Sequence, residues 1–125
     1  MSFLRREYLL ISLLFVGWIA CQPVKTEDLR GQWQAVELTE EGDSLAVNLE
    51  EITLAFSDLG YTFSSTLNYQ EAGTYQLDQN LLTTTDSLNG TAGEKTVEIA
   101  RLQNDSLFIR MNEAGKERRL VMIRK

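Results

Sequence analysis

Hydrophobic and polar residues alternate in short runs along most of the chain. The segments 52–56 and 61–67 alternate cleanly, which predicts strands with one buried face. Similar runs, rich in Val, Ile, Thr, Tyr and Phe, are separated by Gly, Asn and Asp. No amphipathic helix of useful length follows residue 20. We therefore predict strands over residues 32–38, 52–56, 61–67, 73–77, 81–85, 96–102, 106–111 and 118–124.

Short strands at regular spacing are typical of a sandwich or a barrel. Consecutive hairpins favour an up-and-down meander, and closing that meander removes its exposed edges. The predicted fold is all-β: an eight-stranded antiparallel up-and-down barrel that follows an N-terminal signal helix.

The first twenty residues differ from the rest. Arg5 and Arg6 precede an uncharged apolar run over residues 8–20. A basic start, an apolar middle and a small residue at the end indicate a secretory signal. The run has 13 residues, whereas a helix that crosses a bilayer needs roughly 20. A permanent membrane span is therefore less favoured than a cleaved signal.

The signal ends in Trp18-Ile19-Ala20-Cys21, which resembles the lipobox of bacterial lipoproteins. Leucine is usual where Trp18 stands. The resemblance implies acylation of Cys21, with palmitate-like chains that anchor the protein to a membrane. The alternative is a plain signal peptide with an incidental thiol. Cys21 is the single cysteine, so no intrachain disulfide can form. We divide the chain into a signal (1–20), a lipidated tether (21–28) and a barrel (29–125), with one helical turn over 26–29 capped by Thr26.

Gly31-Gln32-Trp33 resembles the Gly-x-Trp signature of lipocalins and of small bacterial lipocalin-like lipoproteins. The segments 29–30, 71–77 and 105–107 are also commonplace in the small bacterial members. The resemblance implies a barrel in which this tryptophan meets an arginine near the end of the last strand. Leu120, Met122 and Arg124 share one strand face, so we expect Arg124 to stack on Trp33.

Charge and composition narrow the function. The full chain has a net charge of −6. Without residues 1–20 it keeps ten basic and seventeen acidic side chains, a net charge of −7. This balance disfavours nucleic acid and anionic lipid surfaces as partners. The chain contains no histidine, which excludes Ser-His-Asp and Cys-His catalysis and histidine metal sites. We expect no enzyme activity, metal or cofactor.

Candidate ligand contacts are the side chains expected to point into the barrel: Tyr61, Phe63, Tyr75, Ile99 and Ile109. The alternative is that they simply fill the core. Arg101 shares strand parity with Ile99. It either lies at the rim in water or points inward, where it would need a partner such as Glu37 or a ligand carboxylate.

Two functions remain open. The first is a lipid-anchored binding module of the bacterial envelope that holds a small apolar or amphipathic molecule. Gln22, which is not aspartate, favours the outer membrane by analogy with lipoprotein sorting. The second is a filled, non-catalytic barrel that binds proteins, as an envelope assembly factor or a hydrolase inhibitor. An interior cavity of roughly 300 Å³ or more favours the first.

Overall fold

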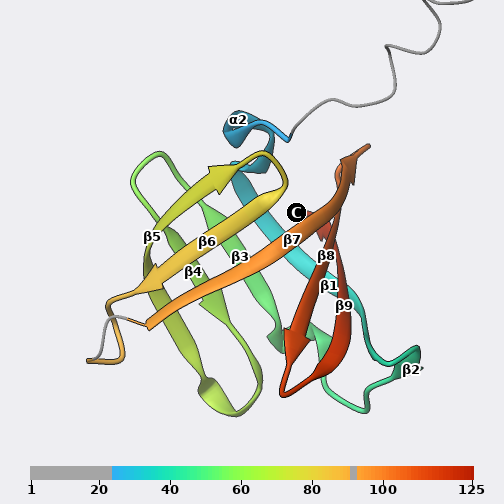
Figure 1. Cartoon of the computed structure of the whole chain (residues 1–125). Coiled ribbons are helices and arrows are strands. Elements are labelled where there is room, and N and C mark those ends of the chain that lie inside the picture. The colour runs from blue at the N-terminus through green and yellow to red at the C-terminus, as the bar shows by residue number, and fades with distance from the viewer. Residues whose placement is uncertain (1–23, 91–92) are drawn as a thin grey trace, which may run out of the picture.

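The computed structural model describes residues 24–90 and 93–125, and these form one antiparallel barrel (Figure 1). Eight strands make its wall, and a short strand, β2, pairs with the end of β1 beyond the barrel. The strands are β1 (Gly31–Glu40), β2 (Asp43–Ser44), β3 (Thr53–Phe56), β4 (Tyr61–Ser64), β5 (Gln70–Asp78), β6 (Leu81–Asp86), β7 (Gly93–Gln103), β8 (Ser106–Glu113) and β9 (Lys116–Arg124). The helical segments are α2 (Thr26–Leu29), η1 (Leu49–Glu51) and η2 (Thr66–Asn68).

Pairing between the first and last wall strands closes the barrel. β1 and β9 are hydrogen-bonded from the pair Trp33–Arg124 to the pair Glu40–Arg118. Every other wall strand pairs with its neighbour in sequence. The prediction of an eight-stranded antiparallel up-and-down barrel is confirmed. The expected signal helix and Cys21 lie outside the described residues.

Several strand limits differ from those predicted. β5 begins at Gln70 and β7 at Gly93, each three residues earlier than expected. β4 ends at Ser64 instead of continuing to Leu67, because Leu67 and Asn68 have positive φ angles that an extended strand does not allow. No helix within residues 24–90 and 93–125 is long and apolar enough to cross a membrane.

Two β-bulges explain where simple alternation fails. Registers shift between Ala35 and Glu37 in β1 and between Ile99 and Arg101 in β7. One extra residue reverses the parity of every residue that follows it in the strand. Unbroken alternation would place Glu37 on the face of Trp33 and Leu38 on the opposite face, and both placements are wrong. For Arg101, which the sequence left open between the rim and an inward position, the inward position is excluded. Leu38 packs against the core, whereas Glu37 and Arg101 are exposed.

One end of the barrel is closed by α2 and the side chains beneath it. Leu29 and Trp33 are fully buried, and the Trp33 indole N–H donates to the Leu29 carbonyl at 2.8 Å. The guanidinium of Arg124 lies 4.3 Å from the Trp33 ring centroid, where the strand parity of β9 places it. Its Nη2 donates to the Asp28 carbonyl at 2.8 Å, and its Nη1 donates to the Arg30 carbonyl. Arg124 thus joins α2, β1 and β9.

The helical turn at residues 26–29 is present, but Thr26 does not cap it. Lys25 occupies the cap position, and no side chain there accepts a hydrogen bond from the helix. The carbonyls at the end of α2 instead meet Arg124 and Trp33. Tertiary contacts, more than local capping, therefore hold this four-residue turn.

Glycine is required at position 31 for two reasons. Its φ is +119°, a conformation that other residues rarely adopt. A Cβ there would lie 2.7 Å from Nη1 of Arg124. The small residue thus lets the guanidinium pass across β1 and reach α2.

We predict that Gly31→Ala lowers the free energy of unfolding by about 2–4 kcal/mol, because backbone strain adds to the displacement of Arg124. Urea denaturation followed by circular dichroism measures this. Gly42→Ala is the matched control, since Gly42 has φ of +87° with nothing within 4 Å of the added Cβ. It should cost about 1–2 kcal/mol. Equal losses for the two variants would contradict the role given to Arg124.

Candidate functional site: a cavity in the open half of the barrel

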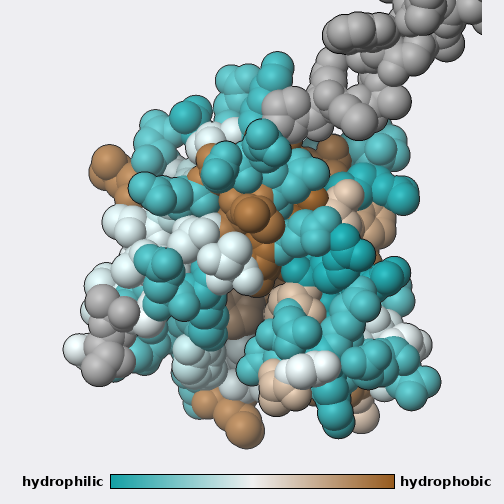
Figure 2. All heavy atoms as spheres, viewed as in Figure 1, coloured by the Kyte–Doolittle hydropathy of each residue, from teal (hydrophilic) through white to brown (hydrophobic). Residues whose placement is uncertain are grey.

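The half of the barrel away from α2 contains a cavity of about 350 Å³. Its wall is mainly apolar, with a few polar and charged groups. The lining residues are Leu54, Tyr61, Phe63, Glu71, Leu82, Thr84, Lys95, Thr96, Val97, Ile109, Met111, Asn112, Glu113 and Leu120. Figure 2 shows hydrophobic atoms inside a hollow on the face drawn, with hydrophilic residues around it. Apolar walls with a few polar groups are typical of small-molecule sites.

Access to the cavity lies between β7 and β8. The ladder between these strands runs from Gln103–Ser106 only as far as Glu98–Arg110. Beyond that pair, residues 93–97 remain paired with β6, and residues 111–113 remain paired with β9. The two strands therefore separate, as Figure 1 shows, and both separated segments contribute to the cavity wall. We call this opening the β7–β8 portal.

An ion pair on the outer face joins β7 and β8 at the point where the two strands begin to separate. Arg110 donates to both carboxylate oxygens of Glu98, at 2.7 and 3.2 Å. Such a bidentate pair has a defined geometry. It joins β7 and β8 at the last residue pair before they separate.

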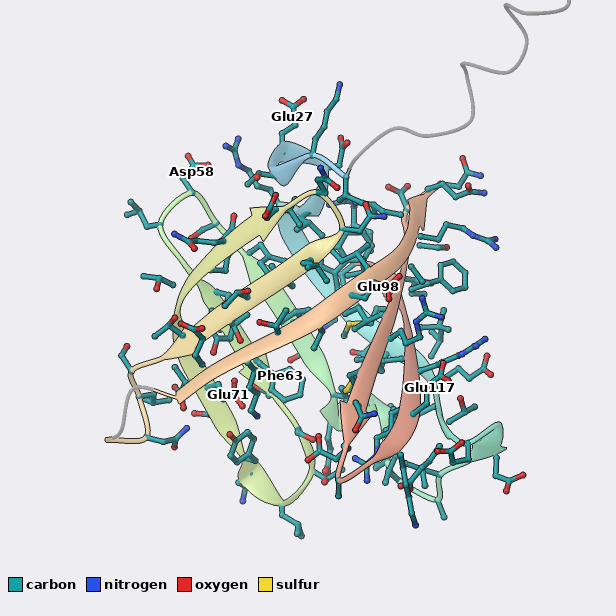
Figure 3. All side chains as sticks on the ribbon, viewed as in Figure 1. Glu27, Asp58, Phe63, Glu71, Glu98 and Glu117 are labelled. Carbon is teal, nitrogen blue, oxygen red and sulfur yellow. The ribbon has the colours of Figure 1, made fainter. Side chains whose placement is uncertain are left out.

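The main polar group of the cavity is the carboxylate of Glu71, which is 5% exposed. Its Oε1 accepts a hydrogen bond from the Tyr61 hydroxyl at 3.0 Å. Its Oε2 accepts from the Tyr69 hydroxyl at 2.6 Å and from Lys95 Nζ at 2.9 Å. β5 therefore supplies the acceptor, and β4, the β4–β5 connection and β7 supply the donors. Glu71 lies near Phe63 inside the barrel in Figure 3.

These contacts determine the protonation states. Burial disfavours the charged form of Glu71, but hydrogen bonds from Lys95, Tyr69 and Tyr61 outweigh it and lower the pKa of Glu71. The hydrogen bond to Glu71 raises the pKa of Lys95. Burial, reinforced by the carboxylate, raises the pKa of Tyr61 from 10.0 to about 12. At neutral pH the site holds a carboxylate, an ammonium and two neutral phenols.

A second buried carboxylate lies close to this cluster. Asp86 is 8% exposed. Its oxygens accept hydrogen bonds from the Leu88 and Ala72 amides and from the Asn89 side chain. These bonds, with that from Asn89 the strongest, lower the pKa of Asp86. Asp86 therefore orders the turn after β6 and adds a negative charge beside Glu71.

The structure brings three of the sequence-predicted contact residues together. Tyr61, Phe63 and Ile109 line the cavity. Ile99 is fully buried in the closed half of the barrel. The Tyr75 ring packs edge-on against Phe56, and its hydroxyl donates to the Ser57 carbonyl at 2.8 Å. Neither Ile99 nor Tyr75 reaches the cavity.

Arg101 lies on the outer wall, because the bulge in β7 turns it away from the interior. Its guanidinium is 5.1 Å from the Phe108 ring centroid. Arg101, Phe108 and Glu37 line a separate pocket of about 330 Å³ on that outer wall. An interior ligand carboxylate is therefore out of reach of Arg101.

Sequence reasoning missed the charged residues of the cavity, Glu71, Lys95 and Glu113. Extending the alternating pattern by up to two residues before the predicted strand starts would have found Glu71 and Lys95. Glu71 has the parity of Tyr75, and Lys95 has the parity of Val97 and Ile99. The predicted starts at residues 73 and 96 left both in loops. Within the described parts of the chain, no group of three acidic or cysteine side chains is arranged to hold a metal ion.

Comparison with solved structures supports the fold. The crystal structure of a lipocalin-like protein from Bacteroides uniformis ATCC 8492 matches with a TM-score of 0.60 and 16% sequence identity. The match covers 78% of this chain and 99% of that one. At this identity the likeness establishes the fold alone. The protein is thus a lipocalin-like β-barrel. No protein-family model and no curated protein matches the sequence.

The hydrogen-bonded cluster around Glu71 predicts how the stability of the protein depends on pH. The lowered pKa of Glu71 gives a contribution that is present above its ordinary value of 4.5 and is lost as the pH falls through the lowered value. The raised pKa of Tyr61 gives a contribution that is complete below pH 10.0 and is lost as the pH rises towards about 12. The free energy of unfolding should therefore fall at both extremes, as measured by urea denaturation at fixed pH.

Substitutions separate the fall in the free energy of unfolding at low pH (the acid limb) from the fall at high pH (the alkaline limb). Glu71→Gln should cost about 1–3 kcal/mol at pH 7, because charged hydrogen bonds are lost, and should flatten the acid limb. Tyr61→Phe should flatten the alkaline limb. Glu50→Gln, at an exposed site, is the control and should change neither limb. An unchanged acid limb in Glu71→Gln would show that Glu71 does not contribute to it.

Proposed function

We propose that this protein is a non-catalytic binding module that holds a small, predominantly apolar molecule with a polar head. The observation that carries the proposal is the cavity of about 350 Å³ within the barrel. An eight-stranded barrel is just wide enough to be filled by its own side chains or to hold one small ligand. This barrel is filled at the α2 end and hollow at the other, which supports a ligand over a filled interaction barrel.

The cavity wall indicates how such a ligand would lie. Aliphatic and aromatic side chains, among them Leu54, Phe63 and Leu82, would contact its apolar part. The polar head would meet Glu71 and Lys95 near the β7–β8 portal. The apolar part would end against the side chains that fill the α2 end, where Trp33 and Leu29 are fully buried.

We further propose that the module is lipid-anchored through Cys21 at the bacterial cell envelope, on the outer membrane. The support is the sequence of the leader, with its basic start, apolar run and lipobox-like end. Several acyl chains would be needed for a stable anchor, because one chain binds a membrane only marginally.

Native mass spectrometry tests the binding role. All described elements, and the pairing that closes the barrel, lie between residues 26 and 124, so the segment from Gln22 contains the whole fold. We expect that segment, purified from its native host, to carry a stoichiometric small molecule that denaturation releases. Val97→Trp should lower its occupancy at least tenfold, because the indole fills the cavity.

Val36→Trp is the matched control for the binding experiment. Val36 is 44% exposed at the bulge in β1, so the same enlargement there should leave occupancy unchanged. A clean unliganded mass, together with no uptake of a fluorescent fatty-acid or fatty-amine probe, would overturn the binding role and favour the protein-interaction alternative.

Lipidation is tested on the full chain in a Gram-negative host. We expect labelled palmitate to be incorporated and the protein to sediment with membranes. Cys21→Ala should abolish the label and release or misprocess the protein, since no other cysteine exists. Ser12→Ala, within the apolar run, should leave labelling intact. Labelling that persists in Cys21→Ala would exclude this site.

A further inference from the structure

We propose that the cavity selects a cationic amphiphile, a molecule with an apolar chain and a protonated amine, over an anionic one. This inference rests on the binding role proposed above. It assigns the charge of the ligand head, which neither the fold nor the apolar wall determines. The argument comes from the charged side chains at the open half of the barrel.

Carboxylates outnumber cations there. Glu71 and Glu113 line the cavity together with one cation, Lys95. Asp86 is a further buried carboxylate close to this cluster. Two other cations have inner-face parity at this end: Arg118, which is paired with Glu40 at 3.7 Å, and Lys116, which stands opposite Glu113 in the β8–β9 ladder. Among the described residues, Glu71, Glu113 and Asp86 against Lys95 and Lys116 leave an excess of one negative charge around the cavity.

Lys95 is the partner most easily displaced. Its side chain is 64% exposed, and it makes a single ion pair, with Glu71. Its ammonium can return to water at little cost, whereas the Glu71 carboxylate is buried and cannot. A ligand amine offers the same N–H donors as Lys95. It would occupy Lys95's place on Glu71, while the hydrogen bonds from Tyr61 and Tyr69 remain.

Glu71 also has room for another donor. Its Oε1 accepts only the Tyr61 hydrogen bond, whereas Oε2 accepts two. A carboxylate oxygen can accept more than one hydrogen bond. An ammonium inside the cavity can therefore bind Oε1 even while Lys95 stays in place.

An anionic head group would find no unpaired cation among the described residues of the cavity and would be repelled by the carboxylates. Lys95 is already paired with Glu71 at 2.9 Å, so a ligand carboxylate would have to share it. The same head would be repelled by the buried carboxylate of Glu71, where like charges are costly, and more weakly by Glu113 at the exposed rim.

Three ligands of equal chain length test the preference: decylamine, 1-decanol and decanoate, titrated calorimetrically into the segment from Gln22 at pH 7.5. We expect decylamine to bind at least tenfold more tightly than decanoate, with decanol between them. Decanoate binding as tightly as decylamine would overturn the charge preference and leave the binding role standing. Binding of none of the three, with no co-purifying molecule, would overturn both.

Variants identify the groups responsible. Lys95→Met should tighten decylamine binding severalfold, because the competing ammonium is gone. If Lys95→Met instead left decylamine binding unchanged or weakened it, Lys95 would not compete for Glu71, and the proposal would fail. Glu113→Gln, at an exposed rim position that does not threaten folding, should reduce the ratio of decylamine to decanoate affinity.

Glu27→Gln is the matched control for overall charge. Glu27 is exposed on α2, at the opposite end of the barrel from Glu71 (Figure 3). It should leave the affinity ratio unchanged. An equal reduction in Glu27→Gln and Glu113→Gln would show that the net charge of the protein, and not the cavity, sets the preference, and the proposal would be wrong.

Discussion

The ladder between β1 and β9 is the contact on which the rest of the structure depends. It joins residues 78 to 91 positions apart and turns an open meander into a closed wall. The Trp33–Arg124 pair lies at one end of this ladder, and there the guanidinium also binds the carbonyls of α2. One side chain thus fixes both the closure of the wall and the position of the short helix that covers it.

The two halves of the closed barrel differ in how completely side chains fill them. In the half beneath α2, side chains such as Trp33, Ile99 and Met122 are fully buried and fill the space. In the other half, the strands separate at the β7–β8 portal, and a buried carboxylate stands where another apolar residue would complete a core. A buried charge is tolerated only with partners, and Glu71 has three. The hollow half therefore contains a hydrogen-bonded polar cluster in place of a completed apolar core.

The sequence predicted the wall well and the site poorly, for a physical reason. Alternation with period two, interrupted by Gly, Asn and Asp, identified all eight wall strands, and the parity of β9 placed Arg124 on the inner face. Bulges carry no clear signal in a single sequence, so alternation put Glu37 on the wrong face and left the face of Arg101 undecided. Glu71 and Lys95 are polar residues at strand ends, where hydrophobic patterning stops being informative. Their proximity arises only from the register of β4, β5 and β7.

The position of α2 has a consequence for orientation at a membrane. The start of α2 at Thr26 is five positions after Cys21, a reach of roughly 17 Å when fully extended. A lipid on Cys21 would therefore hold the α2 end close to the bilayer. The β3–β4 turn lies at that same end, where Arg30 pairs with Asp58 at 2.6 Å and Leu59 is 91% exposed. The hollow half would then face away from the lipid, so its contents would exchange with the aqueous compartment and not with the leaflet that holds the anchor.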